Sequence, residues 1–140
     1  MNNFKSIIDS FSGFSEQHPI IKTFTFGQMS DTGQDEELLD FPLMHVVPLP
    51  STIHDTYTDF NFNIIFASML DDIQSNNIEI VELCHYLLRD FIEYYINQLQ
   101  SFNFYMVTPV NFTPFLDRFS IYVAGVEAQI TLRVEGTYCL

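Results

Sequence analysis

Positive charge is scarce in this chain. The 140 residues contain five Lys and Arg against 18 Asp and Glu, which gives a formal net charge of −13 at pH 7. Proteins that hold nucleic acid draw most of their affinity from clustered basic side chains, which release counterions from the phosphates. The sequence contains no such cluster. The composition therefore argues against nucleic-acid binding, and the acidity is typical of a surface that stays soluble and resists non-specific association.

Cysteine and long apolar runs are equally scarce. Cys84 falls on the apolar face of a predicted helix and Cys139 is the penultimate residue, so we expect reduced thiols, with Cys84 an inert core residue. No apolar stretch approaches the roughly 18 residues of a membrane-spanning helix. The opening MNNFKSIIDSFSG lacks the basic and apolar regions of a signal peptide. The sequence thus predicts no membrane contact and synthesis in the cytoplasm.

The patterns of metal and phosphate sites are also missing. The histidines stand in four separate segments, and no pair has the i, i+4 or short-loop spacing that brings metal ligands together. The glycines are too far apart to build a phosphate-cradling loop. We therefore expect no metal and no cofactor. The histidines are His18, His45, His54 and His85, and the glycines are Gly13, Gly27, Gly33, Gly125 and Gly136.

Two groups of residues resemble catalytic ones only superficially. His54-Asp55 follows Ser51, but no nucleophile-elbow glycines flank any serine, and the segment is a proline-bounded loop. Asp71-Asp72 precede a predicted helix, where the helix dipole favours negative charge. We predict no catalytic residue and expect that the protein is not an enzyme.

Apolar and aromatic residues are plentiful. Hydrophobic residues make up 47% of the chain and aromatic residues 16%, with 15 Phe and 7 Tyr. A chain of this length and composition can bury one substantial core. No internal repeat and no linker divides the sequence. We therefore predict a single domain that spans residues 1–140.

The most regular pattern is a long amphipathic helix from Asn76 to Gln100. Apolar residues recur in it at three- and four-residue steps, which gives the helix one broad apolar face that a sheet must cover. Asn76 and Glu79 can cap its start. The apolar face consists of Ile80, Leu83, Cys84, Leu87, Leu88, Phe91, Ile92, Tyr95 and Leu99.

A shorter amphipathic helix is predicted near the N-terminus. Asn2 or Asn3 can cap its start, and Gly13 together with His18-Pro19 is expected to end it. A helix docked on a sheet explains its apolar stripe better than a membrane-surface helix, because the helix carries a single cation. The stripe consists of Phe4, Ile7, Ile8, Phe11 and Phe14.

Five further segments are rich in β-branched and aromatic residues, as strands are. In the clearest one, Phe60, Phe62 and Ile64 alternate with polar residues, the period expected of a sheet with one buried face. Gly125 falls inside the last strand, where it indicates a bulge, a bend or a close backbone approach. The predicted strands are Ile20 to Gly27, Phe41 to Val47, Tyr57 to Met69, Phe102 to Val107 and Phe119 to Val134, and PLPSTIHDT and TPVNFTPFLDR are predicted connections.

The predicted order of elements is α-β-β-β-α-β-β. Runs of strands interrupted by one long helix, rather than strict alternation of strand and helix, favour the α+β class. We therefore predict a single-domain α+β fold in which a largely antiparallel sheet packs on one long central helix and the short N-terminal helix.

The composition changes abruptly in the segment from Ser30 to Asp40. Five carboxylates surround Gly33 and two adjacent leucines follow, which indicates a long exposed loop or arm. The segment is either a solvated loop or a contact arm toward a neighbouring subunit. In the second case the leucines would pack on the neighbour and the carboxylates would face solvent or a lumen. The candidate interface residues are Asp35, Glu36, Glu37, Leu38 and Leu39.

Several runs between residues 4 and 134 together carry a family resemblance. They are FTFGQ from Phe24, FPLMHVVP from Phe41, FNFNIIF from Phe60, LDD from Leu70, LRDFI from Leu88, PFLDRF from Pro114, AGV from Ala124 and ITLRV from Ile130. In these runs the chain resembles small virion proteins of tailed phages of Bacteroidetes, including crAss-like phages. The shared runs are structural rather than catalytic.

The predicted arrangement is a helix, a β-meander, a long helix and a final hairpin. It is similar to the arrangement in tail-terminator and tail-completion proteins, which form rings between the portal and the tail of a phage. The resemblance implies a tail-terminator-like domain without enzymatic activity, assembled as a homo-oligomeric ring of six or twelve copies. Its partners would be other portal, neck or tail proteins of the virion. The chain departs from the pattern in its last residues, GTYCL.

The expected function is therefore that of a head-to-tail connector subunit, made in the cytoplasm of a bacterial host and located in the virion neck or tail. DNA would pass through the ring without sequence-specific binding, because a channel lined with carboxylates does not hold the duplex. A tail-hub or baseplate subunit of the same virion is the nearest alternative. A small soluble enzyme or ligand-binding module is an alternative of another class, whose mark would be a pocket with convergent titratable groups.

Overall fold

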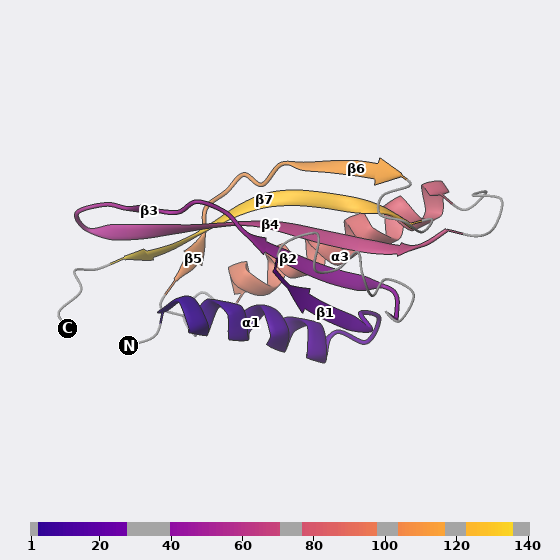
Figure 1. Cartoon of the computed structure of the whole chain (residues 1–140), viewed down its shortest axis with the longest axis horizontal. Coiled ribbons are helices and arrows are strands. Elements are labelled where there is room, and N and C mark those ends of the chain that lie inside the picture. Colours follow the sequence, from indigo (N-terminus) through magenta and orange to yellow (C-terminus); the bar gives the residue numbers. More distant parts are fainter. Residues whose placement is uncertain (1–2, 28–39, 71–76, 98–103, 117–122, 136–140) are drawn as a thin grey trace.

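The computed structural model describes residues 3–27, 40–70, 77–97, 104–116 and 123–135. Within them, two helices lie on one face of a seven-stranded sheet (Figure 1). This arrangement confirms the predicted α+β class and the predicted alternation of helices and strand runs. The elements are α1 (Asn3–Gln17), β1 (Thr23–Phe26), β2 (Leu43–Pro48), β3 (Thr52–Ile53), β4 (Tyr57–Met69), α3 (Asn77–Asn97), β5 (Tyr105–Met106), β6 (Phe112–Leu116) and β7 (Val123–Glu135).

The centre of the sheet is the pair β4 and β7. Each strand has 13 residues, and the two pair antiparallel along their whole length, from Tyr57 opposite Glu135 to Met69 opposite Val123. The sheet order is β1-β2-β4-β7-β5, with β3 added to β4 and β6 added to β7. Strands β1 and β2 run parallel, and the other described pairs are antiparallel. The prediction of a largely antiparallel sheet is confirmed.

The alternation in β4 determines which face of the sheet the helices cover. Phe62, Ile64 and Phe66 are fully buried in the cluster that both helices share, while Asn61 and Asn63 lie on the other face of the strand. The apolar face predicted for α3 packs on the same cluster. Its fully or nearly fully buried members are Cys84, Leu87, Leu88, Phe91 and Tyr95.

Helix α1 runs through Gly13 and ends before His18-Pro19. Gly13 lies inside the helix, and a Cβ added there would meet no atom within 4 Å, so the prediction that Gly13 helps to end the helix is wrong. A glycine in a helix interior costs only about 1 kcal/mol, which the burial of the apolar stripe outweighs. The helix ends at Gln17, directly before His18-Pro19, as that part of the prediction stated.

A buried polar contact joins α1 to α3. The hydroxyl of Ser10 donates a hydrogen bond to the carbonyl of Ile7 at 2.6 Å and accepts one from the hydroxyl of Tyr95. At the end of α1, Nε2 of His18 lies 2.9 Å from Oδ2 of Asp90 on α3. The first contact pairs the buried hydroxyls of Ser10 and Tyr95, which helix packing shields from water.

Two predicted connections contain strands. PLPSTIHDT includes the two-residue strand β3, and TPVNFTPFLDR includes β6. Strand β6 contains Pro114, although proline cannot donate a hydrogen bond to a ladder. It is tolerated here because β6 pairs only with β7 among the described strands, which places it at an edge of the sheet.

Several predicted boundaries shift or lie outside the described residues. Strand β1 begins at Thr23 rather than Ile20 and is followed by Gly27, whose φ of 134° suits glycine and ends the strand as expected. The predicted cap Asn76 and the apolar position Leu99 lie outside the described residues, as do Asp71-Asp72 and Cys139.

Candidate functional site

An apolar groove runs between α3 and the edge segment that carries β5 and β6. The groove consists of three successive hollows. The first, of about 570 Å³, lies at the start of α3 and is lined by Asn77, Ile78, Val81, Pro114, Phe115 and Leu116. The second, of about 310 Å³, is lined by His85, Leu88, Arg89, Ile92, Glu93, Ile96, Val110 and Phe112. The third, of about 390 Å³, is lined by Tyr95, Ile96, Tyr105, Met106 and Thr108.

This α3–β6 groove gathers exposed apolar side chains. Ile78, Ile96, Phe112 and Leu116 line it, and all four belong to the exposed large hydrophobic residues of the described chain. The outer edge of β6 has no strand partner among the described residues. Exposed apolar side chains next to an open strand edge mark a surface that can take up another polypeptide.

The first hollow of the groove differs from the second in charge. Among the described residues, the lining of the first hollow includes no charged side chain. In the second hollow, Nε of Arg89 lies 3.3 Å from Oε1 of Glu93, and the ring centroid of His85 lies 5.2 Å from that of Phe112. The described lining of the first hollow is therefore the less polar of the two.

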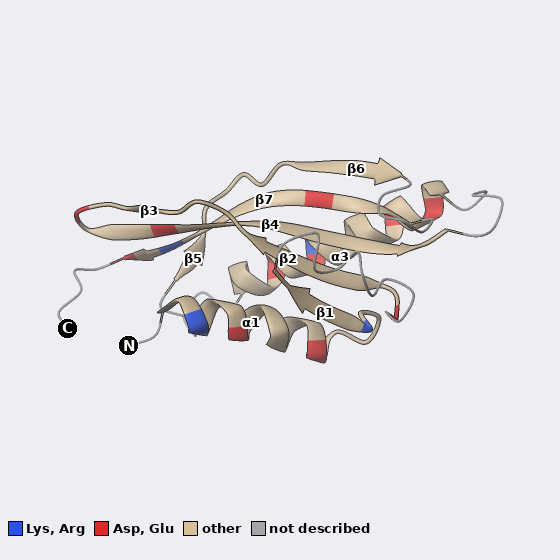
Figure 2. Ribbon diagram, viewed as in Figure 1, with Lys and Arg blue, Asp and Glu red and all other residues tan. Residues whose placement is uncertain are grey.

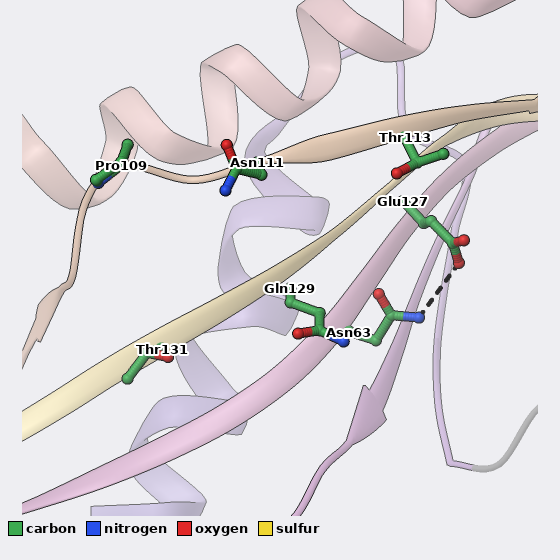
Figure 3. Close-up of a pocket in the computed structure, with 7 residues that line it drawn as sticks. All are labelled: Asn63, Pro109, Asn111, Thr113, Glu127, Gln129 and Thr131. Atoms are coloured by element: carbon green, nitrogen blue, oxygen red, sulfur yellow. Dashed lines mark hydrogen bonds between the residues drawn. The ribbon is translucent and has the colours of Figure 1, made fainter.

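A second pocket, of about 420 Å³, is polar and lies on the helix-free face of the sheet (Figure 3). Its shape follows from the edge segment. Tyr105 and Met106 pair with Arg133 and Leu132, and pairing resumes at Phe112, so that residues 107–111 stand opposite the shorter stretch 129–131. The extra length bows away from β7, as in a bulge, and leaves a hollow. The lining is Asn63, Pro109, Asn111, Thr113, Glu127, Gln129 and Thr131.

The chemistry of the polar pocket is limited to hydrogen bonding. Nδ2 of Asn63 donates to Oε2 of Glu127 at 3.4 Å across the floor of the pocket (Figure 3). Among the described lining residues, Glu127 is the only carboxylate, and none is His, Cys, Lys or Arg. General acid–base catalysis or activation of a nucleophile needs two titratable or nucleophilic side chains within hydrogen-bond reach of each other. The pocket offers amides and hydroxyls to a polar group rather than reactive groups to a substrate.

A third feature is the β3–β4 hairpin, residues 49–61. We call this hairpin the arm, and it is separate from the acidic segment of residues 30–40. Its turn end extends past both helices (Figure 1). Tyr57 is the centre of a side-chain stack at this end. The His54 ring centroid lies 4.2 Å from that of Tyr57, and Cζ of Arg133 lies 4.1 Å from the same ring centroid. Arg133 also donates to both carboxylate oxygens of Asp59, at 2.7 and 3.1 Å.

The base of the arm is held by further hydrogen bonds. Nδ2 of Asn61 donates to the carbonyl of Pro50 at 2.8 Å, and the backbone N–H of Asn61 donates to Oγ of Ser51 at 3.0 Å. Oγ1 of Thr131 donates to Oδ1 of Asn61 at 2.7 Å. β4 also pairs with β7 along residues 57–61, so the arm contains three strands, and these side-chain contacts add to its stability.

Because of the ion pair between Asp59 and Arg133, the unfolding free energy should depend on pH in the acid range. Hydrogen bonds from Arg133 hold the pKa of the Asp59 carboxyl below its ordinary value of 3.8, although partial desolvation acts in the opposite direction. A lowered folded-state pKa contributes stability that is present above pH 3.8 and is lost as the pH falls through the folded-state value. In acid titrations of the unfolding free energy, the advantage of the wild type over Asp59→Asn should be constant above about pH 5 and shrink below pH 3.8.

The exposed pair Lys5–Asp9 provides the control, since its side chains are 66% and 63% exposed. Solvent screens such a pair, and Asp9→Asn should change the unfolding free energy by less than about 0.5 kcal/mol. If Asp59→Asn and Asp9→Asn behave alike across the titration, the pair with Arg133 does not stabilise the arm.

The structure places the four histidines apart. His45 lies buried in β2 with Nδ1 2.6 Å from Oγ1 of Thr25, His18 contacts Asp90, His54 belongs to the arm, and His85 lines the groove. In the described part of the chain, no three His, Cys, Asp or Glu residues come together as metal ligands would. The absence of a metal remains a prediction.

Cys84 is the core residue that the sequence indicated. It is fully buried, and burial raises the pKa of its thiol to about 12. A thiol that stays protonated at neutral pH is a poor nucleophile.

The candidate interface residues Asp35, Glu36, Glu37, Leu38 and Leu39 lie outside the described residues. The interpretation of the acidic segment, residues 30–40, as a contact with a neighbouring subunit therefore stays a prediction. The structure instead adds surface residues that the sequence analysis missed, namely Ile53, Ile78, Phe112 and Leu116. A signal for Phe112 and Leu116 is the alternation of apolar residues at positions 112, 114 and 116, which is the period of a strand.

Charge is distributed without a basic face in the described residues (Figure 2). Lys5 pairs with Asp9, Arg89 with Glu93 and Arg133 with Asp59, so most of the described cations already have a carboxylate of the same chain beside them. None of the described helices is long and apolar enough to cross a bilayer.

Comparison with known proteins adds no assignment to these surfaces. The chain matches no protein-family model and no curated protein.

Proposed function

We propose that the chain is a ring-forming structural subunit of the head-to-tail connector of a tailed-phage virion. The observation that carries the proposal is the α3–β6 groove, which exposes Ile78, Phe112 and Leu116 along an open sheet edge. A chain that exposes apolar side chains beside an unpaired strand is suited to contact another protein. The sequence runs that resemble small virion proteins of tailed phages supply the identity of the assembly.

The electrostatics suit a channel through which DNA slides. The chain carries a net charge of −13, and three described cations are neutralised by neighbouring carboxylates. Such a surface releases few counterions from the phosphates and therefore does not retain the duplex. Repulsion acts over a Debye length of about 8 Å at physiological salt, so it prevents adhesion without blocking passage through a wide ring.

An enzymatic role receives less support from the described residues. The described lining of the polar pocket includes a single carboxylate, and Cys84 is a buried thiol. A catalytic site normally brings together two or more titratable groups with matched geometry. The surfaces described above instead favour protein–protein contact.

The proposal is tested by genetics and by imaging. In a phage whose genome encodes this chain, disruption of the gene should give filled heads and unattached tails, with normal particles restored by a plasmid copy. Mass spectrometry of purified wild-type virions should detect the protein, and negative-stain microscopy of the purified protein should show rings. Normal particles after disruption, or virions that lack the protein, would refute the proposal.

A further inference from the structure

We infer that the polar pocket on the helix-free face of the sheet binds a neutral sugar, a ligand that is rich in hydroxyl groups and carries no charge. The side chains that would contact it are Asn63, Asn111, Thr113, Glu127 and Gln129. This inference goes beyond the proposed connector role and does not depend on it.

The fold does not account for the amide side chains of the pocket. Asparagine is among the residues that strands disfavour, yet Asn63 lies within β4. Asn61, on the same face of β4, has a structural role because its side chain holds the base of the arm. Asn63 has only the long contact with Glu127, at 3.4 Å. The amides of Asn111 and Gln129 have no hydrogen bond to another described residue and are therefore free to contact a ligand.

These polar groups converge on one hollow from three strands and the segment between them. Asn63 of β4 is the cross-strand partner of Gln129 of β7, and Thr113 of β6 is the partner of Glu127 of β7. Asn111 comes from the edge segment that bows away from β7 (Figure 3). Paired strands fix the backbone of most of these residues, so a ligand has to order little of the protein when it binds.

The size of the hollow suits a small molecule. Its volume of about 420 Å³ lies within the range of small-molecule sites, about 300–1,000 Å³. Pro109 adds an apolar surface to the lining, against which the C–H groups of a sugar ring can pack. The pocket thus combines several polar side chains with one apolar contact, as small-molecule sites do.

The chemistry of the lining favours hydroxyl groups over ions. Each amide of Asn or Gln both donates and accepts hydrogen bonds, whereas a carboxylate only accepts them. A hydroxyl group also does both, so neighbouring hydroxyls on one sugar ring can use all of these groups. An anion would meet Glu127 and no cation among the described lining residues. A calcium ion takes about 6–8 oxygen ligands and would leave the amide N–H donors unused.

The same comparison disfavours a peptide as the ligand. A peptide backbone offers one donor and one acceptor per residue, and successive residues of an extended chain are about 3.3 Å apart. A sugar ring instead carries several hydroxyl groups around one small ring. The polar side chains of this pocket surround one hollow rather than follow one strand edge, which suits the ring.

A glycan array and calorimetry on the purified full-length protein test the inference. We expect binding to at least one neutral oligosaccharide of hexose or N-acetylhexosamine units, on the array and in solution. Sialylated and sulfated glycans should not bind, because Glu127 and the net charge of −13 repel them. Failure of every neutral glycan to bind at millimolar concentration would overturn the inference. So would stabilisation by calcium chloride alone that is lost in Glu127→Gln, because this result would indicate a cation site.

Substitutions locate the binding in the pocket. Asn111→Ala and Gln129→Ala should each weaken sugar binding by about twofold to tenfold, and the double variant by more than about tenfold, because hydrogen bonds to the sugar are lost. Both residues are exposed, so the circular dichroism spectrum should not change. Gln17→Ala is the matched control, since Gln17 is an exposed glutamine on α1, in the helix layer, and the variant should bind as the wild type does.

Unchanged binding by the double variant, or an equal loss in Gln17→Ala, would show that the sugar binds elsewhere and would overturn the inference. Either result leaves the connector role intact, because that role is tested on virions. Conversely, absence of the protein from virions would refute the connector role and leave sugar binding by the purified protein unaffected.

Discussion

A Gly125→Ala variant should lose at least about 3 kcal/mol of unfolding free energy and should yield little folded protein. Gly125 lies in β7 directly opposite Ala67 of β4. A Cβ added at Gly125 would lie 1.9 Å from the carbonyl oxygen of Phe66 and 2.9 Å from Cα of Ala67. These are backbone atoms of an interior strand, so relief requires β4 and β7 to separate locally at this pair. Chemical denaturation followed by circular dichroism measures the loss.

Gly13→Ala is the matched control for this substitution. It adds the same methyl group, but the position lies inside α1 with no atom within 4 Å of the new Cβ. Alanine is the better helix former, and Gly13→Ala should raise the unfolding free energy by about 0.5–1 kcal/mol. A Gly125→Ala protein as stable as the wild type would show that the two strands do not approach as closely as described.

Phe91→Ala should cost about 3–5 kcal/mol through lost transfer free energy and a cavity in the core. Phe91 is fully buried on α3 and contacts rings from three elements. Its ring centroid lies 5.6 Å from that of Phe11 and 5.3 Å from that of Phe14 on α1, 6.0 Å from that of Phe66 on β4, and 5.1 Å from that of Tyr95. The substitution therefore loosens α1, α3 and the sheet together, and thermal or urea unfolding detects it.

Tyr86→Ala on the same helix separates this effect from helix propensity. Tyr86 is 54% exposed, and its truncation should change the unfolding free energy by less than about 0.5 kcal/mol. If Phe91→Ala costs no more than Tyr86→Ala, the aromatic cluster does not hold the helices on the sheet.

The arm shows how contacts of distant residues create a surface that local patterns do not predict. Tyr57 and Asp59 belong to one end of the longest strand pair, and Arg133 reaches them from the other strand of that pair. Backbone hydrogen bonds flank the short strand β3, from His54 to Tyr57 and from Leu49 to Asn61. The side-chain stack and these bonds together hold the hairpin.

The sequence by itself determined the elements whose signal is periodic. Leu87 and Phe91 recur one turn apart, and Phe62, Ile64 and Phe66 recur at every second residue, so the buried faces of α3 and β4 could be predicted and are confirmed. This works because helix and strand geometry fix which neighbours along the chain share a face. The α+β class followed from the order of those elements.

Only the tertiary structure decided what each element packs beside. Gly13 was expected to help end the first helix, and the segment that contains Pro114 was expected to be a connection, yet the burial of α1 and the edge position of β6 allow a helix and a strand there. Gly125 indicated a bulge, a bend or a close approach, and the pairing of β7 with β4 selected the last. The groove, the polar pocket and the arm depend on strand register, which arises from contacts between residues far apart in the chain and leaves no periodic signal within it.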